Sequence, residues 1–438
     1  MTGTEPVVLR GRARLLGTGS GEPEPAEVTL LDGEFALGHG SRTRVVAYRD
    51  LATVAVQAGA VLVVLGAGHG AVRFLLDQFG PQQGRLAREL RERRLRQRLA
   101  DAMVRAFGDP IDLVEFERTT GAGSTPEHGV GQLVYHPWGA VLAPVDERVA
   151  WSWIRRAAVG DVALQAGGGD VTVQHGSAAI RLMSLGPAAR VHADRFASLR
   201  DGAAIDAGQL VGRLIPDASY AARQRAALVL VDGRPASPVA LGDAWPALEA
   251  AVLTEPAFAE SYAALRARGG GADALRWIAI APTEPGSDQS RRWFFVGLPG
   301  NLVALELVSE GAHATYCFRV VPRAQFSGST DPEEVRRAVR EVSDALVDAR
   351  FLREPMAIPE DHLGQPRYLR YRLALASLPA LAAARARFVA RLVHRDIESW
   401  AKSLDDLIAW HASSRDDSAS WPGRAAQEAQ VEQAEGEP

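Results

Sequence analysis

The chain has 438 residues, of which 47% are apolar and 23% charged, and its formal net charge is −4. These values are typical of folded chains, so they exclude a largely disordered protein, and roughly 100 to 200 residues per domain allow two to four domains. Cys317 is the only cysteine, which excludes an intramolecular disulfide and a zinc site of several thiolates. Because no stretch reaches ~18 consecutive apolar residues and the first residues lack an apolar signal region, we expect a cytoplasmic protein.

The stretch VLVVLGAGHGAVRFLLDQFGP, which starts at residue 61, contains a glycine-rich turn between two apolar runs. Gly66, Gly68 and Ala71 have the spacing of a dinucleotide-binding turn, which would indicate an NAD- or FAD-dependent oxidoreductase. That motif also needs a helix and then a strand that ends in an acidic residue, whereas Gly80 and Pro81 would end the helix early. We therefore favour a hairpin turn, because glycine adopts positive φ at little cost, and the nucleotide-binding turn from Gly66 to Ala71 is the alternative.

A second copy of this pattern follows about a hundred residues later. Three matched pairs mark its register: Val45 with Val149, Arg73 with Arg181, and Pro81 with Pro187. Each copy has short strands separated by glycine-rich turns and is followed by Gly-Pro and an arginine-containing helix. Because internal repeats outweigh a short motif in determining a fold, the repeat favours two tandem strand-rich units.

Residues 45–94 and 149–200 resemble the pleckstrin-homology-like (PH-like) barrel, in which one helix follows several antiparallel strands. The resemblance implies that the helix closes one end of each barrel. Leu86 and Leu90 in the first copy, and Phe196 and Leu199 in the second, are the expected plugging side chains. Lys402 is the only lysine, and this preference for arginine resembles the residue usage of high-GC bacteria such as actinobacteria.

The helix expected after the first copy carries seven arginines against Glu89 and Glu92: Arg85, Arg88, Arg91, Arg93, Arg94, Arg96 and Arg98. They surround the helix, which favours a solvated helix with i, i+4 ion pairs; the alternative is a surface that binds an anionic partner. For that alternative we expect glutamine at Arg91, Arg94 and Arg98 to weaken binding and to leave folding nearly intact. The apolar face shifts from Leu86 and Leu90 to Leu95, Leu99 and Met103, so the helix should leave its own barrel and pack elsewhere.

A third strand-rich stretch covers residues 277–321, and a helix should follow it. Asp331 and Glu334 can form a capping box, and four apolar residues line one face: Val335, Val339, Val342 and Leu346. From Pro379 we expect a helix of about thirty residues with a narrow apolar seam. Its residues are Ala386, Val389, Val393, Ile397, Trp400, Leu404 and Leu407, which would pack on the third domain or, alternatively, form a homodimer through residues 386–407.

The predicted fold class is therefore α+β, with tandem antiparallel β-barrel or sheet units that are each followed by a helix. The expected parts are 1–110, PH-like unit 1 with the arginine-rich helix; 111–214, PH-like unit 2; 215–275, a helical connector; 276–352, a third strand-rich unit and helix; 353–412, a C-terminal helical region; and 413–438, a disordered acidic tail. The tail holds six acidic residues against Arg415 and Arg424, so the rest of the chain is nearly neutral.

No motif in the sequence assembles a catalytic centre. The segment GLPGN at 297–301 resembles a phosphate-facing turn of molybdopterin-transfer proteins, but Leu302 replaces that family's proline and a strand pattern follows. His394 and Glu398 have the i, i+4 spacing of an ordinary pair on the surface of a helix. We expect His136 and His313 to be ordinary turn or strand residues, and Cys317 to be an unreactive thiol packed within a strand.

We therefore predict no catalytic, cofactor-binding or metal residues, and a non-enzymatic binding or scaffold protein. A protein partner is favoured and an anionic membrane surface is an alternative, whereas nucleic acid is disfavoured by the neutral body of the chain. The competing class is an enzyme whose active site is assembled from distant segments.

Overall fold

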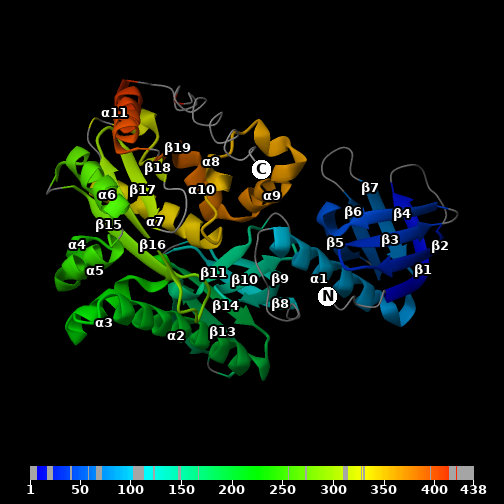
Figure 1. Ribbon diagram of the computed structural model, residues 1–438. Coiled ribbons are helices and arrows are strands. Elements are labelled where there is room, and N and C mark those ends of the chain that lie inside the picture. The colour runs from blue at the N-terminus through cyan, green and yellow to red at the C-terminus, as the bar shows by residue number, and fades with distance from the viewer. Residues whose placement is uncertain are drawn as a thin grey trace. The chain divides into compact units, whose positions relative to one another are not determined.

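In the computed structural model the chain divides into two compact units, Met1–Leu199 (unit 1) and Arg200–Pro438 (unit 2). The structure describes residues 7–16, 23–39, 42–57, 59–65, 72–101, 113–121, 124–146, 149–165, 167–254, 256–271, 274–308, 314–326, 328, 331–394, 396–413 and 421. The fold is mixed α+β with antiparallel sheets (Figure 1). Among the described residues, none of the helices combines the length and apolarity needed to cross a bilayer.

Unit 1 begins with a seven-stranded antiparallel sheet, sheet A, in the order β4-β3-β2-β1-β7-β6-β5. Its strands are β1 (Val7–Leu16), β2 (Glu24–Leu30), β3 (Glu34–His39), β4 (Arg42–Ala47), β5 (Leu51–Gln57), β6 (Ala60–Leu65) and β7 (Val72–Asp77). The 3₁₀ helix η1 (Tyr48–Asp50) joins β4 to β5, and η3 (Gly80–Gln82) leads into helix α1 (Gln83–Asp101).

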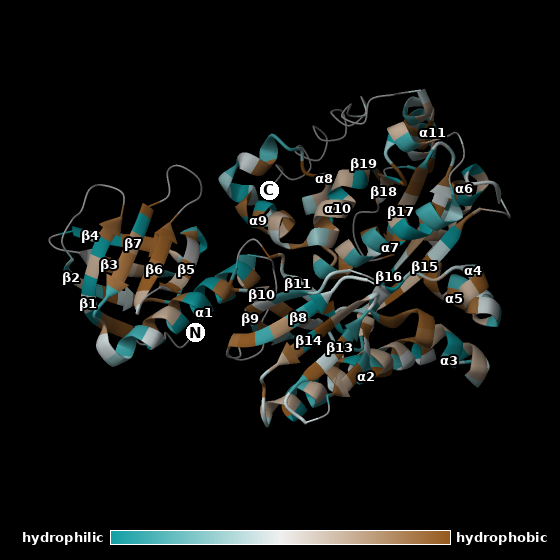
Figure 2. Ribbon diagram, turned by 180° about the vertical axis from the view of Figure 1, so that it is seen from behind, coloured by the Kyte–Doolittle hydropathy of each residue, from teal (hydrophilic) through white to brown (hydrophobic). Residues whose placement is uncertain are grey.

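The described strands on either side of the glycine-rich turn are antiparallel neighbours. Val61 of β6 lies opposite Leu76 of β7, and Leu65 lies opposite Val72. The two strands appear as hydrophobic ribbons in Figure 2. The turn itself lies outside the described residues, but β7 occupies the place where a dinucleotide-binding motif needs a helix, so this stretch does not form that motif.

The second sheet of unit 1, sheet B, repeats the strand order of sheet A: β11-β10-β9-β8-β14-β13-β12. Its strands are β8 (Leu113–Thr119), β9 (Glu127–His136), β10 (Gly139–Pro144), β11 (Ser152–Arg155), β12 (Val159–Leu164), β13 (Val171–His175) and β14 (Ala178–Met183). Here too a 3₁₀ helix, η4 (Arg156–Ala158), joins the fourth strand to the fifth, and helix α2 (Ala188–Leu214) follows the seventh.

The expected plugging residues lie in the cores of the two sheets. Leu86 and Leu90 of α1 are fully buried in the core of sheet A. Phe196 of α2 is fully buried in the core of sheet B, and Leu199 is partly buried against it. The burial expected of these side chains is thus observed, complete for three and partial for Leu199, because an antiparallel sheet with one apolar face needs a cover over that face. That they plug the end of a barrel stays a prediction.

Unit 2 contains a five-stranded antiparallel sheet, sheet C, whose strands follow chain order. They are β15 (Arg276–Pro282), β16 (Ser290–Leu298), β17 (Leu302–Val308), β18 (Ala314–Arg319) and β19 (Phe388–Val393). The strand order β15-β16-β17-β18-β19 differs from that of sheets A and B, so sheet C does not repeat their topology.

Helices cover both faces of sheet C. Trp293 of β16 donates a hydrogen bond to Ser343 of α7, whereas the next residue, Phe294, contacts the ring of Tyr262 on α6. The helices of unit 2 after α2 are α3 (Tyr220–Val229), α4 (Pro238–Leu241), α5 (Trp245–Val252), α6 (Pro256–Arg268), α7 (Pro332–Asp348), α8 (Glu354–Ala357), α9 (Leu369–Ser377), α10 (Pro379–Arg387) and α11 (Ile397–Ser413). Residues 215–275 thus contribute side chains to the core of unit 2.

The long helix predicted from Pro379 is wrong. The chain forms α10, then the edge strand β19, then α11. Phe388 and Val389 begin a run of branched and aromatic residues that pairs with β18, and this pairing outweighs the three-four spacing that suggested one helix. Trp400, Leu404 and Leu407 are buried in the core of unit 2, so this part of the seam offers no exposed surface for a homodimer.

Helix α7 follows its prediction closely. Asp331 is the N-cap and accepts a hydrogen bond from the backbone N–H of Glu333, and Pro332 is the first helical residue. The four apolar residues expected on one face are buried: Val335, Val339, Val342 and Leu346. Glu334, expected to complete a capping box, forms an ion pair of 3.0 Å with Arg337.

Candidate functional site

Helix α1 packs on both sheets of unit 1. Its first half buries Leu86 and Leu90 against sheet A. Its second half buries Leu95 and Leu99 in a separate apolar cluster with β9 and β10 residues of sheet B, Val134, Val141 and Ala143. The predicted shift of the apolar face to Leu95 and Leu99 is confirmed, while Met103 lies outside the described residues.

Three of the seven arginines of α1 bind backbone carbonyl groups of sheet A. Arg91 donates from Nε to the carbonyl oxygen of Val54 at 2.9 Å, and Arg94 donates to that of Leu51 at 2.7 Å. Both acceptors lie on β5, an edge strand of the sheet. Buried backbone carbonyls need hydrogen-bond partners, and edge strands need protection from pairing with other chains. These arginines therefore cover a sheet edge.

Arg93 is the most buried of the seven arginines, with 8% of its surface exposed. It donates to the carbonyl oxygen of Leu31 at 2.7 Å and forms an ion pair with Glu89 at 3.4 Å. The hydroxyl of buried Tyr48 donates to the same carbonyl, and burial raises the pKa of Tyr48 well above its usual range. Arg93 thus links α1 to the core of sheet A.

The expectation that glutamine at Arg91, Arg94 and Arg98 would leave folding nearly intact assumed exposed side chains, whereas all three are partly buried, so it stays a prediction without that support. Arg91 and Arg94 hold β5 carbonyls, and the Arg98 guanidinium lies 5.6 Å from the ring centroid of Trp151. Burial lowers the pKa of all three arginines, and the neighbouring charge of Arg98 lowers that of Arg94 further. The spacing of these residues identified the helix but did not show which arginines face inward.

The arginines exposed to solvent are Arg85, Arg88 and Arg96. Arg85 and Arg88 form i, i+4 ion pairs with Glu89 and Glu92, at 3.9 and 3.8 Å, and the two arginine side chains are 50% and 59% exposed. The predicted i, i+4 pairs Arg88–Glu92 and Glu89–Arg93 are confirmed. The candidate interaction surface of α1 thus divides into an exposed group and an inward group.

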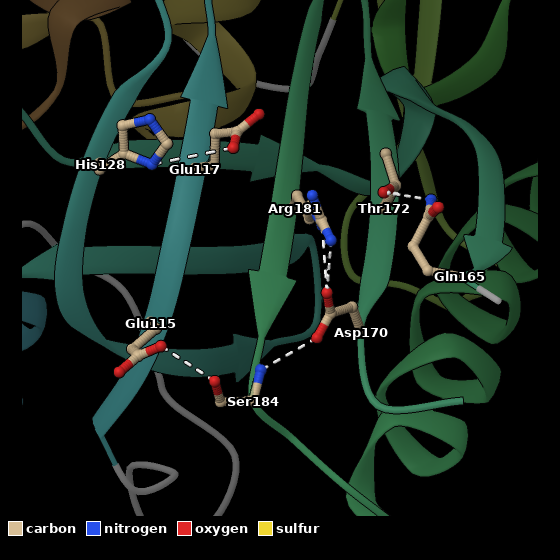
Figure 3. Close-up of polar contacts among 8 residues, drawn as sticks. All are labelled: Glu115, Glu117, His128, Gln165, Asp170, Thr172, Arg181 and Ser184. Atoms are coloured by element: carbon tan, nitrogen blue, oxygen red, sulfur yellow. Dashed lines mark hydrogen bonds and ion pairs between the residues drawn. The ribbon is translucent and has the colours of Figure 1, made fainter. Parts of the chain in front are cut away.

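A row of polar side chains crosses the outer face of sheet B (Figure 3). His128, Glu117, Arg181 and Thr172 are successive cross-strand neighbours on β9, β8, β14 and β13. The guanidinium of Arg181 donates from Nε and Nη2 to Asp170, at 3.1 and 2.7 Å, and these bonds lower the pKa of that carboxyl group. The groups satisfy one another, as expected for the solvent face of an antiparallel sheet.

A buried polar network in unit 2 was missed by sequence reasoning. Glu306 of β17 is 1% exposed, and it accepts hydrogen bonds from Ser261 of α6 at 2.6 Å and from Thr315 of β18 at 2.5 Å. Nε2 of His394 lies 3.1 Å from the Glu306 carboxylate and 2.9 Å from the Thr315 hydroxyl. Trp400 of α11 donates to Thr315 at 2.9 Å.

This network overturns the predicted helix pair of His394 with Glu398. His394 precedes α11, and its ring contacts Glu306 and Thr315 instead. The signal in the sequence was a single carboxylate inside the apolar run LVALELV, since a buried acid needs several partners. Glu306, Ser261 and Thr315 are all buried, so the network ties α6, β17, β18 and α11 together.

Cys317 is fully buried on β18, and burial together with nearby Glu306 raises the pKa of its thiol well above its usual range. Because the thiolate is the reactive form, we expect the folded protein not to react with iodoacetamide at pH 8. Mass spectrometry should detect one alkylated cysteine only after unfolding in guanidinium chloride. Rapid stoichiometric labelling of the native protein would contradict the burial of this thiol.

The other motifs of the sequence have structural roles where they are described. Asn301, at the end of GLPGN, lies in the turn between β16 and β17 with φ +72°, and its buried amide bonds both backbone groups of Val321. Strand β17 follows this turn, as expected, in the place where the phosphate-facing turn would need a helix. His136 is buried at the end of β9, and His313 lies outside the described residues.

No protein-family model matches the chain, and no curated protein is a significant match.

Proposed function

We propose that the protein is a non-enzymatic binding or scaffold protein that holds an acidic protein partner on unit 1. The observation that carries the proposal is that helix α1 packs against both sheets of unit 1. Leu86 and Leu90 belong to the core of sheet A, and Leu95 and Leu99 belong to a cluster with sheet B residues. A helix that packs on two sheets presents a pre-formed surface. The same helix carries the densest cluster of positive charge in the sequence. Firm, pre-formed surfaces lose little entropy on binding.

We also propose that sheets A and B are tandem PH-like units. Their shared strand order and the helix that follows each sheet support this assignment. The buried plugs, Leu86 and Leu90 in one and Phe196 in the other, support it as well. In this proposal the units present surfaces and do not assemble reacting groups.

The exposed arginines of α1 suit an acidic protein better than a membrane. Arg85 and Arg88 are interleaved with Glu89 and Glu92, whereas lipid-binding segments usually have clusters of four to eight basic residues. Exposed i, i+4 ion pairs contribute only about 0.3–0.5 kcal/mol. A partner's carboxylates can therefore replace the intrahelical glutamates at little cost, and arginine can bind them through two hydrogen bonds.

Charge reversal at Arg85 and Arg88 is expected to reduce retention of a protein partner by at least about tenfold, because like charges across an interface are strongly unfavourable. The measurement is affinity purification with chemical crosslinking from the native host, quantified by mass spectrometry. The matched control reverses Arg190 and Arg336, which are also exposed helical arginines in short-range ion pairs.

Partner retention should also weaken markedly by about 0.5 M salt, since the Debye length is ~8 Å at physiological salt. Equal loss of the partner in both double variants would contradict the role of α1. Purification with a stoichiometric metabolite or metal and without a protein partner would favour the competing enzyme class.

A further inference from the structure

A group of arginine and tyrosine side chains lies where the 3₁₀ helix η10 (Pro366–Tyr368) leads into helix α9. The guanidinium of Arg367 lies 4.6 Å from the ring centroid of Tyr368, and that of Arg370 lies 4.9 Å from the ring centroid of Tyr371. The two tyrosine rings stack with their centroids 6.3 Å apart. Both arginines are exposed and both tyrosines are half-buried. We call these four residues the arginine–tyrosine surface of unit 2.

The positive charges of this surface lack acidic neighbours. Residues 362–395 contain no aspartate or glutamate. Arg367 donates to the side chain of Gln365 at 3.0 Å, and within the described part of the chain neither Arg367 nor Arg370 pairs with a carboxylate. Three other exposed arginines of unit 2 do form ion pairs with acidic residues: Arg213, Arg336 and Arg337. A guanidinium above an aromatic ring can still bind a carboxylate through the N–H groups along its edge.

The C-terminal segment of the sequence carries the opposite charge. Trp421 is 7% exposed and belongs to the hydrophobic core of unit 2, so the residues that follow it start from this unit. Residues 422–438 hold four glutamates against Arg424: Glu428, Glu432, Glu435 and Glu437. A segment of this composition has little apolar surface to bury, so charge is its main means of binding.

Residues 422–438 are long enough to reach the arginine–tyrosine surface from Trp421. When extended they span up to roughly 55–60 Å, whereas a compact domain of the size of unit 2 has a diameter of about 45 Å. The anchor and the surface both belong to unit 2, whereas the arginines of α1 belong to unit 1. Tethering within one unit gives the glutamates an effective concentration of about a millimolar near the surface.

We propose that residues 422–438 bind the arginine–tyrosine surface in cis, through ion pairs between their glutamates and the guanidinium groups of Arg367 and Arg370. The tyrosine hydroxyl groups can donate further hydrogen bonds to the same carboxylates. The bound segment shields this surface from other anionic ligands. Single-stranded nucleic acid is the competing ligand, since bases stack on aromatic rings, but here arginines already lie over both rings. This contact lies within unit 2 and is independent of the function proposed for α1.

The test is zero-length carbodiimide crosslinking of the full chain, which joins an amine only to a carboxylate that it contacts. The chain has a single lysine, Lys402 on α11, so Arg370→Lys introduces one new side-chain amine into a nearly lysine-free background. Peptide mass spectrometry should find this amine joined to glutamates of residues 422–438 at least about fivefold more often than the amine of Arg340→Lys, because several exposed ion pairs act together.

Arg340 is the matched control, because it is an exposed arginine of helix α7 without a carboxylate partner among the described residues. Equal crosslinking in the two variants would overturn the proposal, since reach alone would then explain the contacts. In a mixture of unlabelled and nitrogen-15-labelled chains, crosslinks between light and heavy peptides would place the segment on a second copy and overturn binding in cis. Circular dichroism checks that both lysine variants are folded.

Absence of these crosslinks would also overturn the proposal. Binding of a labelled oligothymidylate that is weakened by Arg370→Gln, measured by fluorescence anisotropy, would in that case assign the surface to single-stranded nucleic acid.

Discussion

Replacing Glu306 with alanine is expected to lower the free energy of unfolding of unit 2 by about 2–4 kcal/mol, because a buried group that loses its partner costs about 1–3 kcal/mol, although the Ser261 hydroxyl keeps the carbonyl oxygen of Phe258 as an acceptor. Ser261 and Thr315 both lose their bond to the carboxylate, and His394 loses its contact with it. A urea series with pulsed hydrogen exchange and mass spectrometry, followed in peptides from β17 and β18, reports unit 2 separately.

Two variants control for this result. Glu306→Gln keeps one carbonyl oxygen as an acceptor, so its effect should be clearly smaller than that of alanine. Glu260→Ala removes an exposed glutamate next to Ser261 on α6 and should stay within about 0.5 kcal/mol. If Glu306→Ala and Glu260→Ala had equal effects, the network would not stabilise unit 2.

Replacing Leu90 with alanine is expected to lower the free energy of unfolding of sheet A by about 2–5 kcal/mol, the usual cost of a cavity in a packed core. Leu90 is fully buried beside Leu86, and the same helix holds the β5 carbonyls through Arg91 and Arg94. Faster hydrogen exchange should therefore reach β5 and β6 as well as α1.

Leu228→Ala is the matched control for Leu90→Ala, because Leu228 lies on helix α3 with 72% of its surface exposed. Both substitutions change helix propensity equally, so the difference between them measures burial. An effect of Leu90→Ala confined to α1, with unchanged exchange in β5 and β6, would contradict the role of the helix as a cover for sheet A.

The arginines of α1 show how one residue type can serve stability and recognition on the same helix. Arg93 satisfies a carbonyl of the core, whereas Arg85 and Arg88 remain accessible. Changes at Arg91 or Arg94 would mix the two effects, since both bind β5. For this reason the exposed arginines give cleaner tests of binding.

The sequence by itself determined the elements that depend on local pattern. The glycine-rich turn after Leu65, followed too soon by Gly80 and Pro81 for a dinucleotide-binding helix, predicted a hairpin. The repeat predicted two similar units, and the cap at Asp331 predicted the start of α7. The resemblance to PH-like barrels implied that Leu90 and Phe196 cover the strands, and both are buried in the cores of their sheets. Local periodicity records which face of an element avoids water.

Only the tertiary structure decided which elements meet. Apolar residues spaced by three and four after Pro379 are compatible with one helix. In the structure, however, residues 388–393 form a strand that pairs with β18. The partners of Glu306 come from segments up to 88 residues away, and Val54 lies 37 residues from Arg91. Contacts between residues so far apart in the chain cannot be predicted from the periodicity of a single sequence. They depend on how the packed elements bring distant polar groups within hydrogen-bond distance.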